Sequence, residues 1–188
     1  MIKLGAADLR TTKSTEKEKK QIKKNPIYIV LDNVMDTYNI GSIFRLADAV
    51  AAEKVILCGA TETPPSSRIK KASINTTEWV NWEYCESATE AIKKLKISSF
   101  AKASEGQEKL KIIAIEQSEK SVSYDRVDYS FPLALVVGHE TNGVSKEVLE
   151  MSDQIVEIPM WGINKSLNVM VSLGIVLYEV MKWNNPQV

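Results

Sequence analysis

The sequence has few of the side chains that build disulfide frameworks and metal centres. It contains two cysteines, Cys58 and Cys85, without CxxC spacing, and a single histidine, His139. Small disulfide-rich folds and structural zinc sites need several cysteines, or cysteines and histidines, at short spacing. We therefore expect two reduced, buried thiols and a protein that requires no metal ion.

Long hydrophobic runs are also missing. No uninterrupted apolar stretch reaches the roughly 18 residues that a membrane helix requires, and the N-terminus lacks the apolar segment of a secretion signal. The sequence thus predicts a cytoplasmic protein that does not enter a membrane. At 188 residues the chain suffices for one compact domain and leaves no room for a second large one.

A net charge is absent too, because 24 Lys and Arg residues balance 24 Asp and Glu residues. The balance is uneven, since residues 1–24 hold eight basic and three acidic side chains, a net +5, and the remainder is about −5. We divide the chain into a basic arm, residues 1–25, and a domain, residues 26–188. Such an arm can bind a polyanion. The alternative is a solvated, partly helical surface.

Short apolar runs rich in β-branched residues recur through the domain, and helical spacing of apolar residues follows the first of them. This pattern predicts βαβ units, hence an α/β fold with a mostly parallel sheet and right-handed crossovers. We expect helices at residues 88–96 and 166–183, an exposed loop at 98–109 and a surface connection at 124–130. The strands are expected at residues 27–31, 54–58, 79–82, 111–115, 133–137 and 154–158.

Ligands of parallel sheets collect at the carboxyl ends of the strands. The loops after Leu31, Val137 and Ile158 have the unusual residue content expected of such a site. The turn Gly138–Gly143 lets backbone amides approach a ligand, although it matches neither a Walker loop nor GxGxxG. A site at these three loops is therefore our hypothesis.

Each candidate side chain in these loops also has a purely structural interpretation. Arg45 lies near the start of the first helix of the domain, where its guanidinium and the exposed helix amides would make an anion site. The alternative is a surface ion pair of Arg45 with Asp48 or Asp32. His139 is a candidate base, but no nucleophile motif stands beside it, which favours an ordinary loop side chain. Ser166 and Asn168 either cap the last helix or point into a site.

Three blocks of this chain resemble the motifs of one known family. They are Asn39-x-Gly-x-x-x-Arg45, Val137-Gly-x-Glu-x-x-Gly143 and Ile158-Pro-Met-x-Gly-x-x-x-Ser-Leu-Asn-Val169. In this order and with these gaps they are similar to the motifs of the SpoU/TrmH family of SPOUT RNA methyltransferases. The resemblance covers about residues 26–183.

The resemblance implies an α/β knot, in which the C-terminal segment is threaded into a trefoil knot. It also implies that S-adenosylmethionine lies in the knot against backbone groups of Gly138, Ile158 and Leu167. Members of the family work as homodimers, with the active site near the interface. No metal is implied.

The implied reaction is methylation of a ribose 2′-hydroxyl of tRNA or rRNA, with tRNA ahead of rRNA. The resemblance gives Arg45 the role of taking the hydroxyl proton, with the help of an RNA phosphate. It places Asn39, Glu140, Ser166 and Asn168 as residues that orient the arginine, the ribose or the cofactor loop. Two alternatives are a catalytically silent, knotted RNA-binding or ribosome-assembly factor and an unknotted, flavodoxin-like anion binder.

Overall fold

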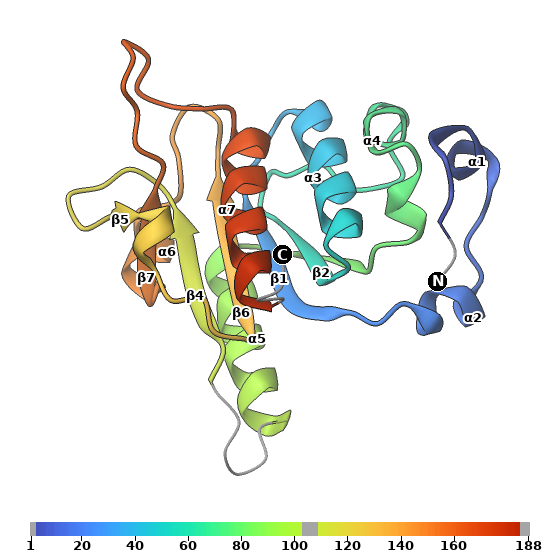
Figure 1. Ribbon diagram of the computed structural model, residues 1–188, viewed down its shortest axis with the longest axis horizontal. Helices are drawn as coiled ribbons and strands as arrows, with labels where there is room; N and C mark the ends of the chain where they lie inside the picture. The colour runs from blue at the N-terminus through green and yellow to red at the C-terminus, as the bar shows by residue number, and fades with distance from the viewer. Residues whose placement is uncertain (1–2, 103–108, 185–188) are drawn as a thin grey trace.

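A seven-stranded sheet runs through the protein in the computed structural model, which describes residues 3–102 and 109–184 (Figure 1). All of its paired strands are parallel, which confirms the prediction from the βαβ pattern. The strand order is β3-β2-β1-β6-β4-β7-β5. The strands are β1 (Asn25–Asp32), β2 (Ala52–Cys58), β3 (Trp82–Cys85), β4 (Lys111–Ile115), β5 (Val122–Ser123), β6 (Leu133–Gly138) and β7 (Gln154–Glu157).

Helices cover both faces of this sheet. Ile29 and Leu31 of β1 join a buried cluster with residues of α3 and α7, while Val30 between them joins a second cluster with residues of α5 and α6. This is the alternation of a strand that is buried on both faces. The helices are α1 (Ala6–Thr11), α2 (Glu16–Gln21), α3 (Thr37–Ala49), α4 (Ser67–Ser73), α5 (Ala88–Lys102), α6 (Lys146–Met151) and α7 (Val169–Asn184).

The helix α3 is fixed at its start and along its packed side. The side chain of Asp36 accepts a hydrogen bond from the backbone N–H of Tyr38 at 2.8 Å and so caps the helix. Gly41 lies against α4, where a Cβ atom would come within 2.5 Å of the Ala72 Cβ and 2.8 Å of the Ile69 carbonyl oxygen. Gly41 is therefore needed for close packing of two helices.

Three predicted element boundaries were wrong. Residues 79–82 are not a strand, because Thr76–Glu78 forms a 3₁₀ helix, Trp79 and Val80 are both buried, and β3 begins only at Trp82. The helix predicted at 88–96 continues to Lys102, so the expected loop at 98–109 begins as helix; its residues 103–108 lie outside the described chain. The last helix begins at Val169, three residues later than predicted.

The connection at residues 124–130 also differs from the prediction. It is partly buried rather than confined to the surface, because Val127 and Tyr129 belong to the core. The Tyr129 hydroxyl donates to the Tyr124 carbonyl oxygen at 2.6 Å. Burial raises the pKa of Tyr129, so this donor keeps its proton at physiological pH. Because polar residues surround Val127 and Tyr129 in the sequence, no hydrophobic pattern indicated that they are buried.

The basic arm is folded against the body of the protein (Figure 1, right). Its second helix, α2, begins with a capping box in which Thr15 and Glu18 exchange hydrogen bonds. Asn75 donates its side-chain amide to the carbonyl oxygens of Leu9 at 3.0 Å and Thr12 at 3.1 Å. Asn75 therefore holds the arm by its backbone. Among the arm lysines, Lys19 lies 3.7 Å from the Glu16 carboxylate on the same helix.

We predict that Asn75→Gly releases the arm. Asn75 has a φ of 68°, which glycine adopts without strain, so this change removes the two hydrogen bonds and little else. With about 1 kcal/mol for each bond, trypsin should cut the arm lysines roughly tenfold faster or more. Mass spectrometry of the early fragments measures this rate. Asn81→Ala, which removes one exposed hydrogen bond to Glu53, is the control, and equal arm cleavage in both variants would contradict the prediction.

Candidate active site

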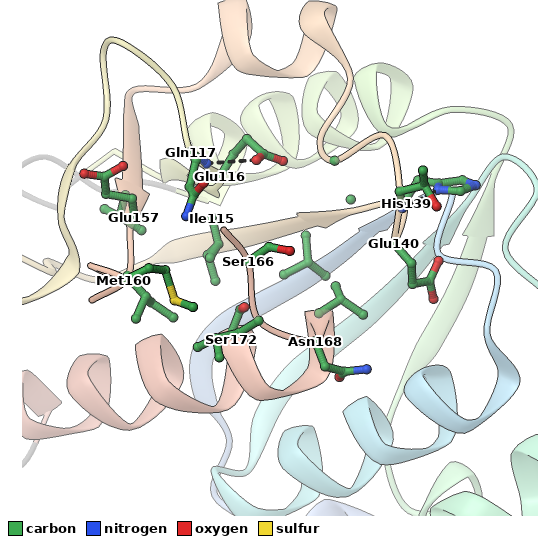
Figure 2. A pocket seen from close by; sticks show the side chains of 18 of the residues that line it. Ile115, Glu116, Gln117, His139, Glu140, Glu157, Met160, Ser166, Asn168 and Ser172 are labelled. Carbon is green, nitrogen blue, oxygen red and sulfur yellow. Dashed lines mark hydrogen bonds between the residues drawn. The ribbon is translucent and has the colours of Figure 1, made fainter. Parts of the chain in front are cut away.

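The loops that follow β4, β6 and β7 enclose a pocket of about 430 Å³ (Figure 2). This volume lies within the range of about 300–1,000 Å³ that is usual for small-molecule sites. The pocket occupies the carboxyl ends of the strands, as predicted, but the loop after β4 replaces the expected loop after β1 in its wall. The candidate residues that line it are Gly138, Glu140, Ile158, Ser166, Leu167 and Asn168.

The turn after β6 forms one side of the pocket and requires its two glycines. A Cβ atom at Gly138 would lie 2.1 Å from the backbone of Gly143, and Gly143 has a φ of 69°. His139 closes the turn, since its Nδ1 accepts hydrogen bonds from the backbone N–H of Thr141 at 3.0 Å and of Asn142 at 3.4 Å. The structure thus uses this histidine as a loop side chain, in agreement with the favoured interpretation.

A hydrogen-bonded chain of three side chains joins the three sequence blocks. The Glu140 carboxylate accepts from the Asn39 amide at 2.9 Å, and the Asn39 carbonyl oxygen accepts from the Asn168 amide at 3.0 Å. Asn39 is buried and does not line the pocket. We call this chain the Glu140–Asn39–Asn168 network. Because its members come from α3, from the turn after β6 and from the loop before α7, it fixes these segments relative to one another.

Asn168 also settles where the last helix begins. Its side-chain oxygen accepts from the backbone N–H of Met170 at 2.9 Å and of Val171 at 3.4 Å, the geometry of a helix cap. The two alternatives from the sequence are therefore both realised, since Asn168 caps α7 and lines the pocket. Ser166 lies in the loop before the cap, is exposed and lines the pocket as well (Figure 2).

Glu140 is held in its charged form. Partial burial by itself would raise the pKa of this carboxyl group, but hydrogen bonds from Asn39 and from the backbone N–H groups of Met35 and Asp36 outweigh it. The net effect lowers the pKa below its ordinary value of 4.5. A carboxylate at this position therefore accepts three hydrogen bonds at neutral pH.

Arg45 lies apart from the pocket within a single chain. It is the ninth residue of the thirteen in α3, so the argument that placed it at the start of the helix was wrong. Its side chain is exposed and does not line the pocket. Within residues 3–102 and 109–184 it forms neither of the expected ion pairs, with Asp48 or Asp32, and Asp32 accepts from the Ser145 N–H instead. The guanidinium is therefore free to bind an anion.

Several pocket residues were not found by sequence reasoning. Glu116 accepts from the backbone N–H of Val144 at 2.8 Å and so fastens the turn after β6 to the loop after β4. Glu157, at the end of β7, accepts from the Ser121 hydroxyl at 2.8 Å. The only available signal was their position, since Glu116 directly follows the strand predicted at 111–115 and Glu157 lies near the end of the strand predicted at 154–158. Trp161, an aromatic residue of interest in the last loop, is 93% exposed and outside the pocket wall.

Two other kinds of site are absent from the described residues. No cluster of three or more His, Cys, Asp or Glu side chains suited to a metal ion exists among the described residues. No helix in the described ranges is both long and apolar enough to cross a membrane.

A model of the SpoU rRNA Methylase family matches residues 26–178, so the chain belongs to this family. The resemblance noted from the three sequence blocks is thereby confirmed. The match begins inside β1 and ends inside α7, and so includes every strand and the whole pocket.

Curated relatives of the chain include RNA methyltransferases of two kinds. A tRNA (guanosine(18)-2′-O)-methyltransferase of Aquifex aeolicus is 32% identical, over 85% of this chain and 71% of the relative. A 23S rRNA (guanosine-2′-O-)-methyltransferase of Ralstonia nicotianae is 31% identical, over 84% of this chain and 59% of the relative. The chain thus spans little more than half of the second protein.

Solved structures agree with this assignment. A TrmH/SpoU tRNA modifying enzyme of A. aeolicus has a TM-score of 0.76 and 28% identity, over 97% of this chain and 83% of that one. An AdoMet-bound rRNA methyltransferase of Sinorhizobium meliloti has a TM-score of 0.74 and 26% identity, over 93% of this chain and 59% of that one. The fold is therefore the α/β fold of SpoU enzymes.

We predict that Glu140→Gln destabilises the protein in a pH-dependent way. Because the folded pKa is lowered, the stabilisation is present above about pH 4.5 and is lost as the pH falls through the folded pKa. The loss at pH 7 should be about 1 kcal/mol, at the low end for a charged acceptor because the side chain is exposed to water. Denaturant unfolding between pH 7 and pH 3 measures it.

Glu147→Gln is the matched control, because Glu147 is an exposed glutamate on the neighbouring helix α6. It should unfold like the unaltered protein at every pH. A stability difference for Glu140→Gln that stays constant down to pH 3 would show that the charge of this carboxylate does not stabilise the network.

Proposed function

We propose that this protein is an S-adenosylmethionine-dependent RNA methyltransferase that methylates a ribose 2′-hydroxyl of tRNA or rRNA. The observation that carries the proposal is the pocket at the carboxyl ends of β4, β6 and β7, whose walls are the family's second and third sequence blocks. The methyltransferase names of the relatives and the AdoMet-bound neighbour support it.

The pocket suits S-adenosylmethionine in its chemistry. Met160, Leu167 and Val169 line the pocket, are partly exposed and offer apolar contacts for an adenine ring. The carboxylates of Glu116 and Glu157 can accept from hydroxyl or ammonium groups and complement the positive sulfonium. We assign Gly138, Ile158 and Leu167 to hold the cofactor through their backbone groups. The bound cofactor supplies an electrophilic methyl group.

The remaining site residues act on the ribose. Its hydroxyl is a poor nucleophile at neutral pH, so its proton must leave as the oxygen attacks the methyl carbon. We assign this step to Arg45. Because a guanidinium is protonated at neutral pH, it can take the hydroxyl proton only as it passes one of its own protons to an RNA phosphate that it binds. Ser166 lies where it can orient the ribose. Asn39, Glu140 and Asn168 position the last loop through their network and so place the cofactor.

We further propose that the protein works in the cytoplasm as a homodimer. The helix α7 buries one side and exposes Val171 and Tyr178, which are seven residues apart and share a face. Leu46 packs against Gly174 on the same helix, which puts the neighbouring Arg45 at the border of this face. A second copy on α7 would therefore lie beside Arg45 and explain why this residue stands outside its own pocket.

We also propose that the C-terminal segment is knotted. After β7 the chain turns back, and the Gln117 side chain donates to the Lys165 carbonyl oxygen, so the last loop lies against the loop after β4. The chain then enters α7, which contacts β4, β6 and α3. In a trefoil knot, the C-terminal segment would pass between neighbouring loops before it forms the helix that packs on the sheet. Such a passage would also shape the pocket.

Among RNA substrates we favour tRNA over rRNA. We propose that the basic arm, residues 1–25, and the domain, residues 26–188, bind it together. Residues 1–24 carry eight basic side chains against three acidic ones, which favours contact with a polyanion. The alternative of a catalytically silent RNA-binding factor is less favoured, because the candidate catalytic residues are present and the pocket is open for a ligand of the right size.

We predict that Arg45→Ala abolishes methyl transfer without affecting the cofactor. The rate with RNA from cells that lack the protein should fall at least about 100-fold, the usual contribution of a proton-transfer group. The S-adenosylmethionine dissociation constant should stay within about twofold, because Arg45 does not line the pocket. Radiolabel transfer and calorimetry measure the two quantities.

Arg68→Ala, an exposed arginine on α4, is the control and should leave the rate nearly unchanged. Retention of turnover by Arg45→Ala would remove this residue from the mechanism. If the unaltered protein bound no S-adenosylmethionine, the catalytically silent alternative would replace the proposed function. Ribose-methylation mapping of the same RNA, with and without the enzyme, identifies the nucleotide.

We predict that Tyr178→Glu dissociates the dimer. Tyr178 is 55% exposed at the centre of the bare face of α7, where a charge would be buried between two copies. Light scattering should show the mass fall from about twice 21.0 kDa to 21.0 kDa. Tyr84→Glu changes a tyrosine of similar exposure on β3 and should remain dimeric; monomeric unaltered protein would contradict the proposed assembly.

A further inference from the structure

A second pocket lies where the arm meets the body, and no residue of it lines the pocket described above. It has a volume of about 460 Å³. Its wall comes from α2, from the segment that leads into α4, from the 3₁₀ helix Thr76–Glu78 and from the start of β3. We call it the seam pocket. The side chains that matter for its chemistry are Lys19, Ser66, Ser67, Lys70, Glu78 and Trp82.

The seam pocket exists because the arm is docked. The Ser14 hydroxyl donates to the Glu78 carbonyl oxygen at 2.6 Å, and Asn75 holds the backbone of Leu9 and Thr12 on the same side. These bonds bring α2 and its Lys19 to the 3₁₀ helix that lines the pocket. One lysine therefore comes from the arm and the other, Lys70, from the domain.

The seam pocket has the groups that a nucleotide requires. Trp82 is 36% exposed at the edge of the sheet, so an indole face is available for stacking on a base. Lys70 can neutralise a phosphate, and so can Lys19, whose ammonium also lies 3.7 Å from the exposed Glu16 carboxylate on α2. Glu78 also lines the pocket, and its carboxylate would repel a simple anion, whereas it can accept from a base amino group or a ribose hydroxyl. A pocket wall that combines an indole, two lysines and a carboxylate thus suits a nucleotide better than a free phosphate.

The seam pocket is distant from the cofactor pocket. Trp82 begins β3, an edge strand, whereas the cofactor pocket lies at the ends of β6, β4 and β7. Three strand positions separate β3 from β6, which is roughly 14 Å at the usual strand spacing. A nucleotide in the seam pocket would therefore belong to a part of the RNA other than the methylated residue.

We propose that the seam pocket binds one unpaired nucleotide of the RNA substrate, with its base on Trp82 and its phosphate between Lys19 and Lys70. This inference rests on the proposed function for the identity of the ligand. It adds a recognition site at a distance from the reaction, built jointly by the arm and the domain. The arm then serves as one wall of a defined site in addition to supplying positive charge.

The test compares neighbouring lysines and two changes at one tryptophan. Equilibrium binding of bulk bacterial tRNA and of purified ribosomal RNA is measured between 50 and 200 mM KCl, about the range over which phosphate contacts are weakened by salt. The tighter RNA is used for the variants. Lys70→Ala removes a lysine of the seam pocket, and Lys71→Ala removes its neighbour on α4, which does not line the pocket.

Charge and stacking have different signatures in this assay. Lys70→Ala should weaken binding about threefold to tenfold and lower the salt slope by about 0.7 to 0.9, the value for one phosphate contact. Trp82→Ala should weaken binding at least about fivefold with an unchanged slope, because stacking involves no counterion. Trp82→Phe, which keeps a stacking ring and guards against misfolding, should bind within about twofold of the unaltered protein.

The outcomes separate this inference from the proposed function. Equal effects of Lys70→Ala and Lys71→Ala, or a Trp82→Ala variant that binds RNA normally, would overturn the seam pocket, while methyl transfer by the unaltered protein would leave the function standing. Failure of the unaltered protein to bind either RNA would overturn both. Calorimetry with S-adenosylmethionine should give the same affinity for every variant, since none of these residues lines the cofactor pocket.

Discussion

The arrangement of the active site depends on the hydrogen bonds that join Glu140, Asn39 and Asn168. They connect residues that are 101 and 129 positions apart in the chain. Two of the partners form further bonds, since Asn168 caps α7 and Glu140 accepts from the backbone before α3. A carboxylate that accepts three hydrogen bonds is well satisfied. This shared bonding explains how loops from separate strands can hold one geometry.

The sequence was sufficient for the fold and for most of the pocket. Buried parallel strands such as β1 and β6 are nearly continuous apolar runs, so they are visible without any knowledge of their neighbours. The rule that ligands meet the carboxyl ends of such strands then located the turn after Val137 and the loop after Ile158. The order and spacing of the three motifs identified the family, which hydrophobic periodicity alone could not do.

Features that arise from contacts between distant segments were beyond sequence reasoning. Glu116 has no local pattern around it and acquires its role only when Val144 comes to lie beside it. The docking of the arm rests on Asn75, a residue in an ordinary polar stretch. Arg45 was placed correctly on α3 but at the wrong end, because the helix start was inferred from Asn39 rather than from the capping residue Asp36.

Gly41 illustrates how a motif position can matter without touching a ligand. It faces α4 at a distance that admits no side chain, while Asn39, two residues earlier and about 200° around the helix, faces the opposite way. Any larger residue would push α3 outward and carry Asn39 with it. A random-mutagenesis screen for inactive enzyme would therefore recover position 41 together with the chemical residues, and the glycine would be mistaken for one of them.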